Sequence, residues 1–255
     1  MYICSNSMIT ENRRIAGGVY SMLVKCGDIA GSVRPGQFVS IVCGFPGALL
    51  RRPISVCGSD GEIIRLVYET RGRGTDWLSQ QPEGFELDIS GPQGNGFTVS
   101  GDGRVLLVGG GLGAAPLLFA AKTLGKRTDA VLGFRGKDQI VLLDEFIDNC
   151  GNVALATDDG SAGVHGTVAD PLKKTLTAGG YETVLACGPR PMRKAVAEIC
   201  SAAGIACEVS LEERMACGMG ACLVCVCETK HADGTSCMSR VCRDGPVFDS
   251  SEVVW

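Results

Sequence analysis

Closely spaced cysteines near the C-terminal end constrain this chain more than any other feature. Six of its 14 cysteines fall within one short segment, at Cys217, Cys222, Cys225, Cys227, Cys237 and Cys242. The first three follow the C-x4-C-x2-C spacing of plant-type [2Fe–2S] centres. The residues alone leave the last three open as the fourth ligand, although Cys227 lies too close to Cys225 to reach easily round a cluster. Since an iron–sulfur cluster exchanges single electrons, the spacing predicts a protein that carries electrons between two redox partners.

Two other interpretations of the cysteines fit the sequence less well. A structural zinc site favours paired C-x2-C knuckles, and the segment contains one such pair, Cys222 and Cys225, preceded by a longer spacing. A disulfide scaffold is typical of small secreted chains, whereas this chain has 255 residues and its other cysteines are scattered. Scattered cysteines in apolar stretches are more often buried free thiols. We therefore expect an iron–sulfur centre in a reducing compartment, the cytoplasm.

Composition and charge exclude several classes of protein. The net charge is −4, and no basic run resembles a nucleic-acid-binding surface. The N-terminal residues lack the uninterrupted apolar core of a signal peptide. No stretch approaches the roughly 20 apolar residues of a membrane span. We expect neither a nucleic acid nor a membrane as a partner.

The pattern of apolar residues divides the chain into three parts. Residues 1–100 contain short apolar or alternating runs separated by Gly, Pro and Asp, which predicts an antiparallel β-barrel. Residues 101–211 alternate strands with helices, which predicts a doubly wound parallel sheet. The expected strands are Val105–Val108, Ala130–Phe134, Val153–Ala156, Thr183–Cys187 and Ala206–Leu211, with helices beginning near Ala114, Val168 and Met192. Residues 212–255 form the cysteine segment, which is so short that we expect a metal centre to organise it.

A glycine-rich turn follows the first strand of the second part. It contains Gly109, Gly110, Gly111 and Gly113, and Pro116 stands in the helix after it. Without Cβ atoms, backbone N–H groups and a helix N-terminus can approach a pyrophosphate. A sharp bend from strand to helix would also require glycine, so this motif alone is a weak indication of a nucleotide site. Further candidates at the carboxyl ends of strands are Asp158, Cys187, Gly188 and Pro189.

A basic motif stands in the barrel part. It consists of Arg52, Pro53, Ile54 and Ser55, and by itself it fits an edge strand interrupted by proline. The forked, permanently charged guanidinium of arginine also suits a pyrophosphate. A second glycine turn and the strand before it add the candidates Val67, Tyr68, Glu69, Gly74 and Thr75.

Together, the basic motif, the Gly-x-Gly-x-x-Pro turn and the Cys-Gly-Pro segment resemble the ferredoxin-reductase family. The resemblance implies that FAD binds the barrel, with Arg52 at the flavin pyrophosphate and Ser55 near the isoalloxazine ring. It implies that Tyr68 offers its flat ring to the flavin.

The same resemblance implies a pyridine nucleotide at the parallel sheet. The glycine turn would meet its pyrophosphate, the Cys187–Pro189 segment would lie beside the nicotinamide, and Asp158 would lie on the ribose side. Asp158 and Asp159 would repel a 2′-phosphate, which favours NAD over NADP. Arg135, near the end of the second strand, favours the opposite choice.

The end of the chain narrows the resemblance further. Val241–Phe248 looks like the end of the electron-transfer subunits of dihydroorotate dehydrogenase B, whose cluster domain ends in Cys-x-Asp-Gly-Pro-Val-Phe. This resemblance covers essentially the whole chain and implies that Cys242 joins Cys217, Cys222 and Cys225 as the fourth ligand.

The resemblance also implies a partner and a route for electrons. A separate subunit would hold FMN and oxidise dihydroorotate to orotate in pyrimidine biosynthesis. Electrons would then pass through the [2Fe–2S] cluster and FAD of this chain to NAD+, within a heterotetramer. The chain would contain no catalytic acid–base residue of its own, because the cofactors carry the chemistry.

Two other functions share part of these features. The FAD and [2Fe–2S] subunits of NAD(P)H:ferredoxin transhydrogenases and of sulfur-reducing hydrogenases are similar. In the transhydrogenase subunit, however, the first ligand position resembles Asp, and here it is Cys217. The other alternative is a nucleotide-binding interaction module with a zinc site. Colour would separate it, since a flavin and iron–sulfur protein is brown-red and a zinc protein is colourless.

Overall fold

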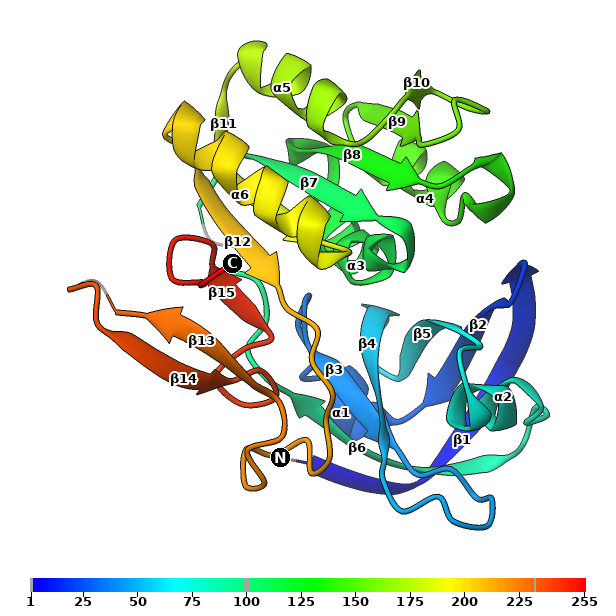
Figure 1. The fold of residues 1–255 in the computed structure, drawn as a ribbon. Helices are drawn as coiled ribbons and strands as arrows, with labels where there is room; N and C mark the ends of the chain where they lie inside the picture. The colour runs from blue at the N-terminus through cyan, green and yellow to red at the C-terminus, as the bar shows by residue number, and fades with distance from the viewer. Residues whose placement is uncertain (1, 99–100, 232) are drawn as a thin grey trace.

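The N-terminal part folds into a closed antiparallel barrel. The structure is a computed structural model that describes residues 2–98, 101–231 and 233–255 (Figure 1). The barrel order is β1-β2-β5-β4-β3-β6, from β1 (Tyr2–Ala16), β2 (Val19–Lys25), β3 (Phe38–Ile41), β4 (Arg52–Ser59), β5 (Ile63–Glu69) and β6 (Glu86–Gln93). Alternate residues of β2 and β5, such as Met22, Val24, Ile64 and Leu66, fill its interior. Two short helices, α1 (Gly27–Ala30) and α2 (Arg73–Ser79), complete this part. The predicted barrel is confirmed.

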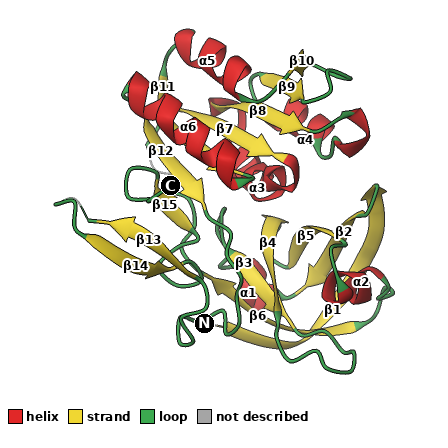
Figure 2. Cartoon of the chain, viewed as in Figure 1, coloured by secondary structure: helices red, strands yellow, loops and turns green. Residues whose placement is uncertain are grey.

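A seven-stranded sheet forms the second part, in the order β10-β9-β8-β7-β11-β12-β15. Its strands are β7 (Arg104–Gly110), β8 (Thr128–Phe134), β9 (Val153–Thr157), β10 (Val164–His165), β11 (Tyr181–Cys187), β12 (Ala206–Ser210) and β15 (Val247–Asp249). Helices α3 (Ala114–Leu124) and α4 (Leu143–Asn149) cover one face, and α5 (Ala169–Thr177) and α6 (Arg190–Ala203) cover the other (Figure 2). Consecutive residues of β7 face opposite helices, since Leu106 packs in the α5–α6 core and Leu107 in the α3–α4 core. The predicted doubly wound sheet is confirmed.

Helix α4 and strands β10 and β15 are described elements of this part that the sequence pattern did not predict. Helix α4 begins after Leu142, which has a left-handed φ of 63° and provides no side-chain cap, so the usual signal of a helix start is missing. Strand β15 is three residues long and pairs antiparallel with β12. It comes from the cysteine segment, so the end of the chain returns to the edge of the sheet.

The cysteine segment contains regular structure of its own. Strands β13 (Val226–Lys230) and β14 (Ser236–Arg240) form an antiparallel hairpin. Val241, Phe248 and Val253 are buried in the same core as the α5–α6 face of the sheet. Strand β15 and this apolar packing therefore fix the segment in addition to the metal centre that we expect there.

Strand β4 lies where the barrel meets the sheet. Cys57 of β4 and Val67 of β5 share a buried core with Leu117 and Leu118 of α3. The helix that follows the glycine turn therefore packs directly on the barrel strand that carries the basic motif. In the described ranges, no helix is both long and apolar enough to cross a membrane.

Candidate functional site

The loop between β12 and β13 curls through three residues with left-handed backbone conformation. Gly218 has φ 67° and Gly220 has φ 85°, which glycine adopts without strain. Leu223 has φ 59° and exposes 61% of its surface. A non-glycine residue in this region costs about 1–3 kcal/mol. The curled loop brings Cys217, Cys222 and Cys225 back toward the residues after β14.

The four expected ligands lie in two hydrogen-bonded pairs. Cys217 pairs with Cys222, and its sulfur also accepts the Met219 N–H at 3.5 Å. Burial opposes ionisation of Cys217, but the surrounding backbone N–H groups lower its pKa to about 6. Cys225 pairs with Cys242, whose N–H donates to the Cys225 sulfur at 3.4 Å. Burial and the Cys225 thiol raise the pKa of Cys242 to about 12 in the metal-free chain, so cluster binding would have to displace its proton.

This donor set fits a two-iron cluster. Each iron of a [2Fe–2S] centre takes two protein ligands, and the thiols form two pairs. Among the described residues, no three His, Cys, Asp or Glu side chains gather closely enough to hold one metal ion.

The other two cysteines of the segment lie in the hairpin. The Cys237 sulfur is 3.1 Å from the Thr229 hydroxyl, on the neighbouring strand. Cys227 lines a separate cavity beside α6. Among the described residues, neither is hydrogen-bonded to the thiol pairs, whereas Cys242 is paired with Cys225.

A partly exposed ion pair holds the residues around Cys242. Arg240 binds Asp244 through two nitrogens, at 2.9 and 3.0 Å, and also donates to the Gly220 carbonyl at 3.3 Å. The Arg240 guanidinium lowers the pKa of Asp244, which stays ionised. The Asn95 amide donates to the Asp244 carbonyl at 2.9 Å. The arginine thus links the turn after β14 to the cysteine loop, and Asn95 fixes the turn to the barrel.

The cysteine loop also touches the barrel directly. A Cβ on Gly218 would come within 3.0 Å of the Gln93 side chain and 3.1 Å of the Ser40 hydroxyl. Both side chains are buried, and they are hydrogen-bonded to each other at 2.6 Å. Ser40 is the β-sheet partner of Pro53. The loop is therefore one strand away from the basic motif.

The basic motif and the second glycine turn meet at the barrel wall. Arg52 opens β4, and a Cβ on Gly74 would collide with the Arg52 side chain at 2.2 Å. The Thr75 hydroxyl accepts the Arg71 N–H at 2.9 Å, which closes the turn. Ser55 pairs with Phe38, two strand positions beyond Pro53. The structure thus brings Arg52, Ser55 and the turn together on neighbouring elements.

Tyr68 differs from its expected role. Its side chain is 2% exposed, stacks on Tyr20 at 5.9 Å between ring centroids, and donates its hydroxyl to Asn12 at 3.1 Å. Burial raises the pKa of this phenol further above its ordinary value. The ring belongs to the barrel core, whereas Val67 points to the opposite side of the strand, into the core shared with α3. Of the three expected residues in this strand, Glu69 alone is partly exposed.

The nucleotide turn and the Cys187–Pro189 segment pack against each other. Gly109 pairs with Cys187 in the sheet. A Cβ on Gly113 would lie 2.4 Å from the Cys187 carbonyl oxygen, and one on Gly110 would lie 3.0 Å from Pro189. Gly111 has φ 53° and open space around it. Close packing therefore excludes a side chain at Gly110 and Gly113. At Gly111 it is the left-handed backbone conformation that favours glycine.

Two further residues of this region have clear structural roles. Pro116 lies in the first turn of α3, where its missing N–H removes no helical hydrogen bond. Burial raises the pKa of Cys187 to about 11, so this thiol is neutral near pH 7. Gly188 has φ 155° and its Cβ position lies 3.0 Å from the Gly110 nitrogen.

The acidic loop lies after β9, at the carboxyl edge of the sheet. The Asp158 N–H bonds the Phe134 carbonyl and the Asp159 N–H bonds the Arg135 carbonyl, at 3.0 and 3.2 Å. The Asp159 carboxylate accepts the Ser161 hydroxyl and N–H, which lower its pKa. Asp158 is exposed. The loop thus places the carboxylates of Asp158 and Asp159 at the end of β9, which is two strands away from β7 and its glycine turn.

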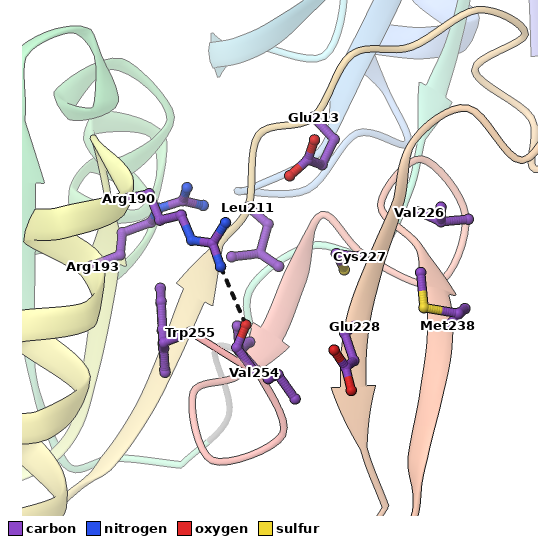
Figure 3. Close-up of a pocket in the computed structure, with 11 residues that line it drawn as sticks. Arg190, Arg193, Leu211, Glu213, Val226, Cys227, Glu228, Met238, Val254 and Trp255 are labelled. Carbon is purple, nitrogen blue, oxygen red and sulfur yellow. Dashed lines mark hydrogen bonds between the residues drawn. The ribbon is translucent and has the colours of Figure 1, made fainter.

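A cavity of about 370 Å³ separates α6 from the hairpin (Figure 3). Arg190 donates across it to the Val254 carbonyl at 3.5 Å, while Glu213 and Glu228 line other parts of its wall. Arg193 is 5% exposed and donates to the Ser210 carbonyl at 2.7 Å, but its Nε has no partner. Nothing in the sequence pattern indicated that this helical arginine is buried.

Comparison with known proteins agrees with this arrangement. Residues 212–254 match the family model described as the iron–sulfur cluster binding domain of dihydroorotate dehydrogenase B. The curated dihydroorotate dehydrogenase B (NAD+) electron transfer subunit of Caldanaerobacter subterraneus is 43% identical over 97% of both chains. Its counterpart from Clostridium perfringens is 41% identical over 96% of both chains.

Solved structures show the same fold. An NADH-dependent reduced ferredoxin–NADP oxidoreductase, described for flavin-based electron bifurcation, superposes with a TM-score of 0.86 at 32% identity, covering 99% of this chain and 91% of that chain. The ferredoxin reductase of carbazole 1,9a-dioxygenase has a TM-score of 0.67 at 22% identity, covering 80% and 67%. This likeness shows a ferredoxin-reductase fold. By its similarity along nearly the whole length to the curated subunits, the chain belongs to the family of dihydroorotate dehydrogenase B (NAD+) electron transfer subunits.

Proposed function

We propose that this chain carries electrons from a dihydroorotate-oxidising, FMN-containing subunit to NAD+ in pyrimidine biosynthesis. The observation that carries the proposal is the position of β4, which has the cysteine loop one strand away on one side and α3 packed on it on the other. When bound, a [2Fe–2S] cluster exchanges single electrons and FAD exchanges one or two, so together they can join one-electron transfer to two-electron reduction of NAD+. The chain needs only to hold and orient these groups.

Each part of the chain supplies one site in this proposal. Residues 1–100 would hold FAD, through Arg52–Ser55, the backbone of Val67–Glu69, and Gly74 and Thr75. Residues 101–211 would hold NAD, through the Gly109–Gly113 turn, Asp158 and Cys187–Pro189. Residues 212–255 would hold the cluster through Cys217, Cys222, Cys225 and Cys242. The exposed carboxylate of Asp158 supports NAD over NADP.

An exposed apolar patch on the cysteine loop supports a protein partner at this face. Met219, Leu223 and Val224 expose 50%, 61% and 52% of their surfaces. Apolar side chains that cluster on a surface mark interaction sites, and docking there would bring the partner's electrons close to the cluster. We propose a heterotetramer of two such pairs. The free thiols of the described cysteines support a reducing, cytoplasmic environment.

Transfer to or from ferredoxin is the second candidate function. The 32% identical, nearly full-length match to a ferredoxin–NADP oxidoreductase structure favours it. The higher identity of the dihydroorotate dehydrogenase subunits and the cysteine at position 217 favour the first.

Anaerobic NAD+ reduction by dihydroorotate tests the proposed function. This chain is mixed with a candidate FMN subunit, and each protein is assayed alone as a control. We expect activity in the mixture only. If the mixture is inactive while FAD and iron are both present, and reduced ferredoxin supports NAD(P)+ reduction instead, the second candidate replaces the first.

Replacement of Arg52 by methionine should weaken FAD retention by roughly 10- to 100-fold. A hydrogen bond to a charged group contributes about 1.5–3 kcal/mol, and methionine keeps the apolar stem that packs against Gly74. The measurement is FAD per chain after desalting, together with the dissociation constant of added FAD.

Arg51→Met is the matched control for this change. Arg51 is the neighbouring residue, but it binds Asp88 on the barrel surface at 3.0 Å. Its replacement should leave FAD content unchanged. Equal FAD retention in the Arg52 variant and the parent chain would remove Arg52 from the flavin site.

A further inference from the structure

Three charged side chains outside the proposed cofactor sites join the barrel to the sheet. Arg65 of β5 binds both carboxylate oxygens of Glu145 in α4 at 2.7 Å, and Lys122 of α3 binds the same carboxylate at 2.7 Å. Arg65 also donates from Nε to the Ser21 hydroxyl at 2.9 Å. We call Arg65, Lys122 and Glu145 the interdomain triad.

The triad is partly shielded from water. The Arg65 and Glu145 side chains expose 16% and 32% of their surfaces. Burial opposes ionisation of Glu145, yet the bonds from Arg65 and Lys122 lower its pKa below the ordinary value. One Arg65 nitrogen, Nη1, lies 2.7 Å from both Glu145 oxygens. A carboxylate that pairs with two cations in a network contributes more than an isolated exposed ion pair.

Each member of the triad lies on an element that carries, or adjoins, a proposed cofactor motif. Arg65 stands in β5 just before Val67–Glu69. Lys122 stands in α3, the helix that begins after the glycine turn. Glu145 lies in α4, which packs beside α3. The triad thus fixes the flavin-bearing strand relative to the nucleotide-bearing helix.

The two parts of the chain are joined differently on the other side. There the cysteine segment makes the link. Leu211 N–H of the sheet part donates to the Pro246 carbonyl, and Asn95 N–H of the barrel part donates to the Gly245 carbonyl, at 2.7 and 2.6 Å. Figure 1 shows α4 and β15 on opposite sides of the junction between barrel and sheet. On the α4 side, a cleft of about 380 Å³ lined by Arg65, Val141 and Glu145 adjoins the triad. On that side the barrel and the sheet also share the apolar core that contains Val67 and Leu117, and the triad adds charged contacts to it.

We propose that Glu145 is a positioning residue for hydride transfer between the nicotinamide and the flavin. It acts through Arg65 and Lys122, which hold the sheet and the barrel at one separation and angle. This inference rests on the proposed function of the two sites. Since transfer requires the reacting atoms in near contact, a displacement of about 1 Å can cost up to about 100-fold in rate.

The test is single-turnover reduction of the flavin by NADH, followed by stopped-flow absorbance in the holoprotein. Glu145→Gln keeps the shape of the side chain and removes its charge. The limiting rate should fall by about 10-fold, while the NADH dissociation constant from the same titration changes by less than about 2-fold and FAD and iron contents do not change. Added salt should slow the parent chain and have little effect on the variant, because screening weakens the same ion pairs.

Glu198→Gln is the matched control, because Glu198 pairs with Lys194 at 4.0 Å on the exposed side of α6. Its limiting rate should equal that of the parent. Arg65→Met and the double variant Arg65→Met, Glu145→Gln complete a double-mutant cycle of the limiting rate. Because both changes break the same ion pair, the double variant should be little slower than either single variant. If Glu145→Gln folds poorly, the same rate measurement is made on Glu145→Asp and Lys122→Met, whose limiting rates should also fall.

The outcomes separate this inference from the proposed function. If NADH does not reduce the flavin of the parent chain, the proposed function fails. If the parent reacts and the triad variants have unchanged limiting rates, or change only the NADH dissociation constant, the positioning role of Glu145 is overturned.

Discussion

Replacement of Cys242 by alanine should remove the iron–sulfur cluster and leave FAD bound. Cys242 is the partner of Cys225 in one of the two thiol pairs, and alanine offers no donor atom to the iron. The flavin motifs lie in the barrel, away from this change. Iron per FAD should fall to near zero, the visible absorption should become that of a simple flavoprotein, and transfer from the FMN subunit to NAD+ should be lost. Direct reduction of the flavin by NADH should persist.

Cys237→Ala is the control for this experiment. Cys237 lies in the same segment but is hydrogen-bonded to Thr229 within the hairpin. Its removal should leave iron content intact. Parent-level iron in the Cys242 variant, or loss of iron from the Cys237 variant, would contradict the ligand set proposed here.

Replacement of Gly113 by alanine should slow flavin reduction by NADH by roughly 100-fold. The new methyl group would lie 2.4 Å from the Cys187 carbonyl oxygen and 2.7 Å from the Gly188 nitrogen. Both neighbours are backbone atoms, so the glycine turn and the Cys187–Pro189 segment must move apart. These are the two segments proposed to hold the pyrophosphate and the nicotinamide. The measurement is the single-turnover rate together with the NADH dissociation constant.

Gly27→Ala provides the comparison. Gly27 lies at the start of α1 in the barrel, and a Cβ there would meet no atom within 4 Å. Its rate should match that of the parent chain. Iron and FAD contents should be unchanged in both variants, since neither lies in the proposed flavin or cluster sites. An unchanged rate in the Gly113 variant would show that the nucleotide does not depend on this contact.

The sequence predicts the architecture well because the barrel and the sheet each depend on a repeated pattern. The apolar runs Val105–Val108 and Ala130–Phe134, expected as strands, appear directly within the observed β7 and β8. Strand β15 could not be predicted in the same way. Its three residues are stable as a strand because they pair with β12, and that pairing is a tertiary contact with no local signal.

The residues of the candidate site also differ in whether a local sequence pattern can predict them. Spacing along the chain identifies Cys217, Cys222 and Cys225, because one loop must present all three. The proposed fourth ligand, Cys242, lies in a separate turn, and cysteine spacing alone does not select it over Cys227 or Cys237.

Long-range contacts account for what the sequence pattern missed. The burial of Tyr68 follows from its stacking on Tyr20 and its bond to Asn12 in two other strands. The bond between Arg65 and Glu145 joins residues 80 positions apart. No window along the chain contains both partners of such a contact.

Anaerobic titration of the purified chain with NADH, followed by visible absorbance and low-temperature electron paramagnetic resonance, tests the central claim most directly. The claim is that this one chain joins a two-electron nucleotide site to a one-electron centre. We predict that NADH bleaches the flavin and that a paramagnetic signal from a reduced [2Fe–2S] cluster appears in the same titration. Bleaching of the flavin without that signal, in a protein that retains its iron, would contradict electron transfer between the two sites.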